Sequence, residues 1–134
     1  MREICEQSED YANIGMELIR NEKNLNWMLE MGISVGFMSS NKAKISNGRV
    51  IYGQCERVQD KYKAFIPYDF LITIYEPNVI EFTADQIKIL LYHELLHCGI
   101  NMNAETTYKV KPHDIEEFED IIERYGMHWS DIHG

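Results

Sequence analysis

The chain has 134 residues, a hydrophobic fraction of 45% and a formal net charge of −9 at pH 7. This length is typical of one domain, so we expect residues 1–134 to form a single domain that buries a core without disulfides or a structural metal. The negative charge repels a phosphate backbone and argues against nucleic-acid binding. No apolar run is long enough to cross a membrane.

The start of the chain and its cysteines both favour a cytoplasmic protein. Residues 1–10 are acidic and polar, unlike a secretory signal. The three cysteines, Cys5, Cys55 and Cys98, are odd in number and widely spaced, so they do not predict a disulfide framework. A reducing compartment fits this pattern best.

Charge is unevenly distributed along the chain. The middle of the chain is locally basic, with Lys42, Lys44, Arg49, Arg57, Lys61 and Lys63. The C-terminal segment is strongly acidic, with Asp114, Glu116, Glu117, Glu119, Asp120 and Glu123. We interpret both groups as solvated faces. The alternative is a basic patch that binds a nucleic acid or an acidic partner.

The first predicted element is a helix that begins after Ser8, a residue suited to cap it. Its apolar positions follow helical spacing, at Tyr11, Ile14, Leu18 and Ile19. Weak helix formers interrupt its continuation toward Met31. Gly32 is expected to end it.

Three strands are predicted next. Alternation over residues 33–37 indicates the first, and the turn pair Asn47-Gly48 introduces a second at residues 50–52. The apolar run at residues 70–75 lies between two prolines and predicts the third. Residues 56–66 are ambiguous, and residues 107–111 favour a further short strand.

Two helices complete the predicted order. Thr83 and Gln86 have the spacing of a capping box, and a helix should run from there to about Cys98, ended by Gly99. Pro112 and Asp114 mark the start of a last helix. The predicted fold class is therefore α+β, with a small, mainly antiparallel sheet.

One motif carries chemistry: His93-Glu94-Leu95-Leu96-His97 matches H-E-x-x-H on a helix. Residues four apart share one side of a helix, so both imidazoles can converge on one zinc ion. Glu94 is placed to take a proton from a water on that metal, whose pKa zinc lowers to about 7.

The residues around the motif strengthen its interpretation as a metal site. The helix is apolar nearly all round, which predicts burial, and burying a carboxylate is costly without a compensating interaction. A metal site accounts for His93, Glu94 and His97 together. The alternative is that the histidines are ordinary core residues and that Glu94 pairs with a lysine.

A third zinc ligand is expected downstream of the helix. The metzincin pattern is excluded because Asn103 stands where its histidine would be. His113, at the head of the last predicted helix, is the favoured ligand. Glu117 is its rival, although it is one of six acidic residues in that segment. His128 and His133, near the end of the chain, are treated as bystanders.

Cys55 is a further rival, because peptide deformylases use a cysteine upstream of their H-E-x-x-H helix. The deformylase signature is missing here, since Glu56 and Arg57 follow Cys55. We therefore expect Cys55 to pack as a small apolar residue.

Three stretches resemble the phage metallopeptidase family: Phe65 to Phe70, Tyr92 to His97, and Pro112 to Phe118. The family occurs in phages and prophages. A more distant resemblance is to SprT-like zinc peptidases. These resemblances imply a zincin-like domain, zinc ligation by His93, His97 and His113, and a base role for Glu94.

The function expected from these features is a zinc-dependent metallopeptidase with a protein or peptide substrate. Zincins hold a peptide along a sheet edge, and the strand at residues 70–75 is the predicted edge. One alternative is a metal-stabilised binding module that does not cut its partner. Another is a zinc amidase acting on a non-protein amide, because the motif reports water activation and not the bond attacked.

Overall fold

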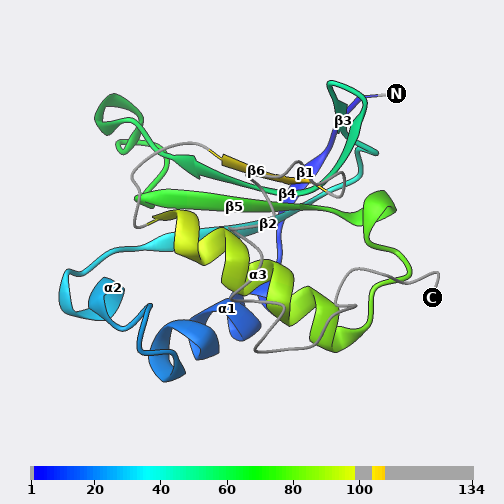
Figure 1. Ribbon diagram of the computed structural model, residues 1–134. Helices are drawn as coiled ribbons and strands as arrows, with labels where there is room; N and C mark the ends of the chain where they lie inside the picture. Colours follow the sequence, from blue (N-terminus) through cyan, green and yellow to red (C-terminus); the bar gives the residue numbers. More distant parts are fainter. Residues whose placement is uncertain (1, 99–103, 108–134) are drawn as a thin grey trace.

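A twisted sheet with helices packed against one face makes up the part of the chain that the computed structural model describes, residues 2–98 and 104–107 (Figure 1). The elements, in chain order, are β1 (Cys5–Gln7), α1 (Glu9–Asn21), α2 (Trp27–Glu30), β2 (Val35–Ser40), β3 (Ile45–Ser46), β4 (Arg49–Arg57), β5 (Phe70–Tyr75), α3 (Ala84–Cys98) and β6 (Ala104–Thr107). Two short 3₁₀ turns, Asp60–Tyr62 and Glu76–Asn78, flank β5.

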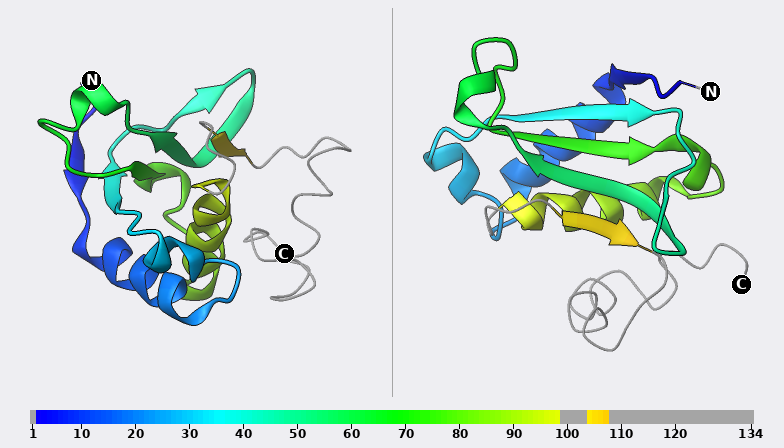
Figure 2. Two further views of the ribbon diagram at one scale, coloured as in Figure 1. Left: turned by 90° about the vertical axis from the view of Figure 1, so that its left-hand side faces the viewer. Right: turned by 90° about the horizontal axis from the view of Figure 1, so that it is seen from above.

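The strands are ordered β1-β2-β5-β4-β3, and β6 also pairs with β4. Among the described strands, β2 and β5 run parallel, and the other pairings are antiparallel. Figure 2 shows this order from above, with α3 crossing beneath β5 and β4. The predicted α+β class and mainly antiparallel sheet are confirmed. The last predicted helix, from Asp114, lies outside the described residues.

The prediction that residues 70–75 form a peptide-binding edge is wrong. Strand β5 lies between β2 and β4, so both of its edges are already paired. Its inward residues Phe70, Ile72 and Ile74 are buried in the core. A continuous apolar run is typical of such a central strand. The outermost described strands are β1, β3 and β6.

The first helix ends ten residues earlier than the predicted limit near Met31. Ser8 caps it as expected, its Oγ accepting from the Tyr11 N–H at 3.2 Å. At the other end, the Asn26 side chain donates to the carbonyls of Ile19 and Arg20 at 2.8 and 2.9 Å. This contact satisfies carbonyls that a continuing helix would have used. A separate short helix, α2, follows, and Gly32 with φ +66° stands after it.

The Asn47-Gly48 turn is confirmed. Both residues have positive φ, 52° and 73°, as a two-residue hairpin turn requires. The turn joins β3 to β4, which spans nine residues rather than the three expected. Of the strand predicted at residues 107–111, the structure describes Thr107, the last residue of β6; the others lie outside the described residues.

Helix α3 begins as predicted. The Thr83 Oγ1 accepts from the Gln86 N–H at 3.2 Å, and the Gln86 Oε1 accepts from the Thr83 N–H at 2.8 Å. This reciprocal pair is a capping box. It fixes where the helix starts.

Candidate metal centre

Helix α3 is enclosed between the sheet and α1 (Figure 1). Ten of its fifteen residues are buried, as its all-round apolar pattern predicts. The Asn24 side chain, in the turn after α1, donates to the Tyr92 hydroxyl at 3.1 Å. This contact connects that turn to the residue next to His93.

His93 and His97 are brought together on one side of α3. Their Nε2 atoms lie 3.2 Å apart, and their rings are nearly perpendicular at 87°. Two nitrogens that each lie about 2.0–2.1 Å from one tetrahedral zinc are about 3.3 Å apart. The pair therefore fits two positions of one zinc ion. Without a metal, the same separation suits a hydrogen bond in which one ring donates to the other.

The chemistry of this pair also fits metal binding. Burial, and then the charge of nearby His97, lower the pKa of His93 to about 3. Its imidazole is therefore neutral at physiological pH, which is the form that binds a metal. The two side chains are almost enclosed, with His93 3% and His97 6% exposed.

Glu94 lies on the adjacent face of the helix and is directed toward β4. Its exposed fraction is 0%. A Cβ built on Gly53 of β4 would be 3.0 Å from its Oε2, so the carboxylate occupies the space in front of this glycine. Position 94 is one residue, about 100° of helix rotation, from His93. The carboxylate is thus beside the histidine pair and backed by the sheet.

Cys55 and Cys98 form a second contact between β4 and α3. Their Sγ atoms are 3.6 Å apart and both thiols are free and buried. The contact with Cys98, together with burial, raises the pKa of Cys55. A cysteine ligates metal as the thiolate, so a raised pKa makes Cys55 a poor ligand. Its packing in the core agrees with the expected role as a small apolar residue.

Within residues 2–98 and 104–107, no group of three or more His, Cys, Asp or Glu residues is arranged to hold a metal ion. His93 and His97 contribute two donors. Both candidates for the third position, His113 and Glu117, lie outside the described residues, as do the bystanders His128 and His133. Their roles remain predictions.

Comparison with protein families decides the broader assignment. The model of a family described as "Putative phage metallopeptidase" matches residues 3–134. The chain belongs to this family. The match includes the H-E-x-x-H helix and His113, and it confirms the resemblance predicted from the sequence. Neither the curated proteins nor the solved structures include a match to the chain.

Membership in a metallopeptidase family implies a bound metal and a protein substrate. The pair of facing histidines is the part of the described structure that suits such a metal. No helix within the described part of the chain has the length and apolarity needed to span a bilayer.

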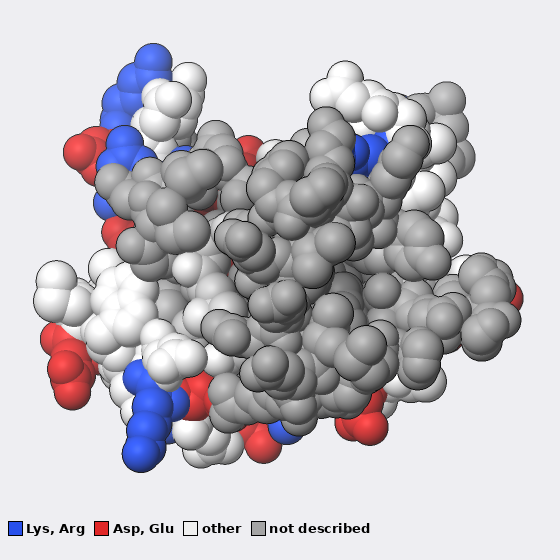
Figure 3. Space-filling view, in the orientation of Figure 1, with Lys and Arg blue, Asp and Glu red and all other residues white. Residues whose placement is uncertain are grey.

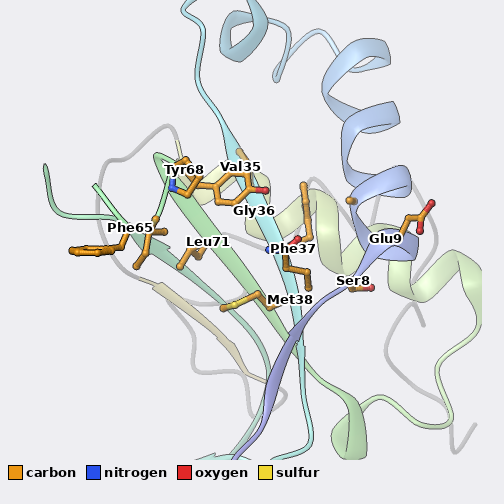
Figure 4. Close-up of a pocket in the computed structure, with 13 residues that line it drawn as sticks. Ser8, Glu9, Val35, Gly36, Phe37, Met38, Phe65, Tyr68 and Leu71 are labelled. Atoms are coloured by element: carbon orange, nitrogen blue, oxygen red, sulfur yellow. The ribbon is translucent and has the colours of Figure 1, made fainter. Parts of the chain in front are cut away.

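A cavity of about 670 Å³ lies elsewhere in this family member, beside β2 (Figure 4). Its lining comes from the start of α1, from β2 and from the loop that carries Phe65 and Tyr68. His93, Glu94 and His97 do not line it. This cavity and the candidate metal-binding side chains are therefore separate features.

On the face shown in Figure 3, described Lys and Arg side chains lie in separate small groups, some of them beside Asp and Glu side chains. In the middle segment, Lys44 and Lys63 are examples of basic residues with local partners. The Lys44 ammonium donates to the Gln54 Oε1 at 2.7 Å, and Lys63 pairs with Asp69 at 2.8 Å. These contacts agree with the interpretation of this segment as an ordinary solvated surface.

Sequence reasoning missed one residue of the site, Gly53. A glycine inside a strand is a signal for close approach of another group. The partner on the other side of that approach is 41 positions away in the chain and becomes visible only in the fold.

Proposed function

We propose that the protein is a zinc-dependent peptidase that acts in the cytoplasm, with residues 1–134 forming one zincin-like domain. The observation that carries the proposal is the 3.2 Å separation of the His93 and His97 Nε2 atoms on a buried helix, with Glu94 between them in sequence. Family membership supports a metal and a peptide substrate.

In this proposal, His93 and His97 hold the metal, and His113 supplies the third protein ligand. Three protein ligands leave one position open, which is the arrangement of catalytic rather than structural zinc sites. When bound, zinc would acidify a coordinated water and polarise the substrate carbonyl. Glu94 then accepts the proton from the attacking water and delivers it to the departing amine.

The sheet supports this chemistry by position. Strand β4 lies against the Glu94 side of α3 through Gly53 and Cys55. The neutral His93 ring keeps its nitrogen available for the metal over the physiological pH range. A carboxylate held against a rigid strand needs little rearrangement when proton transfer begins.

Cleavage of a peptide library tests the activity. We expect the zinc-loaded protein to produce new peptide termini, detected by mass spectrometry, and His97→Ala to produce none. Chelator should abolish cleavage by the parent, and added zinc should restore it. Cleavage that is equally fast in His97→Ala would contradict the proposal.

The complete burial of Glu94 favours a second candidate, a metal-stabilised binding module. A structural site needs no access for water, whereas a base must reach one. Unfolding of the whole chain at ambient temperature after metal removal, together with no cleavage in the library, would select this candidate. A fold that persists without metal would select the peptidase.

A further inference from the structure

Gly53 and Glu94 face each other across the contact between β4 and α3. A Cβ at position 53 would lie 3.0 Å from Glu94 Oε2, and 3.3 Å from both Ile74 Cδ1 and the Thr73 carbonyl oxygen. Ordinary carbon contacts are about 3.5–4.0 Å. An added methyl group would therefore be crowded most by the carboxylate, which would have to shift by a few tenths of an ångström.

A positive φ does not explain the glycine at position 53. Positive φ occurs at Gly32 and Gly48 among the described glycines, and not at Gly53. Gly53 pairs with Ile74 of β5 and with Thr106 of β6, at the point where the register between β4 and β6 shifts between Ile51 and Gly53. Glycine inside a strand often marks an irregular pairing or the close approach of another group, and Gly53 has both features.

We propose that Gly53 is a positioning residue for Glu94, an inference that rests on the base role given to Glu94 in the proposed function. The empty side-chain position lets the carboxylate lie against β4, beside the histidine pair. A methyl group at position 53 displaces the carboxylate from that location. A shift of about 1 Å can reduce turnover by about 10²-fold, so a shift of a few tenths of an ångström should cost less, on the order of 10-fold.

The competing explanation is general packing, because Ile74 and Thr73 also lie close to the added methyl group. The two explanations differ in what relieves the crowding. If the carboxylate is the main obstacle, removing it makes room for alanine. If Ile74 or the Thr73 carbonyl is the main obstacle, removing the carboxylate changes nothing.

A double-mutant cycle, measured by thermal unfolding in the presence of chelator, distinguishes the positioning role of Gly53 from general packing. We expect Gly53→Ala to lower Tm by about 5 °C in the parent. In a Glu94→Ala background the same substitution should lower Tm by less than about 2 °C. Equal shifts in the two backgrounds would overturn the proposal.

Gly36→Ala provides the matched control. A Cβ at position 36 of β2 would also be crowded, at 2.9 Å from side-chain carbons of Leu71 and Tyr68. Neither neighbour is Glu94, so the Tm shift of Gly36→Ala should be the same in both backgrounds. Additivity is the rule for sites without shared partners.

Metal binding and turnover supply the functional readouts. Gly53→Ala should retain as much zinc as the parent, because its obstacle is Glu94 and not a histidine. With labelled casein as the probe, kcat should fall on the order of 10-fold while KM stays unchanged. If the parent cleaves neither casein nor the peptide library but the thermal coupling is present, the placement of Glu94 by Gly53 stands and the peptidase assignment fails.

Discussion

Glu94→Gln is expected to keep its zinc and to lose peptide hydrolysis by about 10²–10⁴-fold, the usual contribution of a general base. Glutamine has nearly the same shape as glutamate, so it fits the fully buried position against Gly53. It cannot accept the proton of the attacking water. The metal should stay because His93 and His97 are unchanged. Measuring turnover on a cleaved peptide and zinc content in the same samples checks both the loss of hydrolysis and the retention of zinc.

Glu17→Gln is the control for this substitution. It makes the same chemical change at an exposed position of α1, away from the histidine pair. Its turnover should equal that of the parent. Normal turnover in Glu94→Gln as well would remove Glu94 from the mechanism, and loss of zinc in Glu94→Gln would show that its carboxylate supports metal binding instead.

Leu95→Ala is expected to give the largest loss of stability. Leu95 lies within the motif and is fully buried in the core cluster. Truncating such a leucine leaves a cavity and costs about 2–5 kcal/mol of unfolding free energy. For a chain of this size, Tm should fall by about 8–15 °C. Tm should be measured in the presence of chelator, because bound metal would otherwise add to the stability of the folded protein.

The neighbouring leucine is the matched control. Leu96 occupies the other variable position of the motif but is only partly buried. Leu96→Ala should lower Tm by less than half as much. Equal losses from the two substitutions would contradict the packing of α3 described above.

Local signals in the sequence were sufficient for most elements near the site. The capping box at Thr83 and the turn at Asn47-Gly48 depend on residues a few positions apart, and both form as predicted. Helix α3 is buried because nearly every side chain on it is apolar. These features follow from short-range chemistry and periodicity.

Contacts between segments that are distant in the chain were harder to predict from the sequence. Strand β1 has three exposed residues and no alternating pattern, so nothing local predicted it. The central place of β5 depends on which strands flank it, and its own residues leave that open. The early end of α1 depends on the Asn26 side chain reaching back to helix carbonyls.

In the candidate site, too, local features were predicted from the sequence and long-range contacts were not. The spacing of His93 and His97 predicted their convergence, and the structure places their nitrogens 3.2 Å apart. The approach of Gly53 to Glu94 and of Cys55 to Cys98 joins residues more than 40 positions apart. No local pattern encodes such contacts, because they arise only when α3 packs on the sheet.

Zinc per chain, measured by elemental mass spectrometry on protein purified without chelator or a histidine tag, tests the central claim most directly. The parent should carry about one zinc ion, as a single H-E-x-x-H site requires. His97→Ala and His113→Ala should lose most of it, and His128→Ala should keep it. A parent that holds no zinc even after zinc is added would contradict the metal centre, and full retention by His113→Ala would contradict the third ligand.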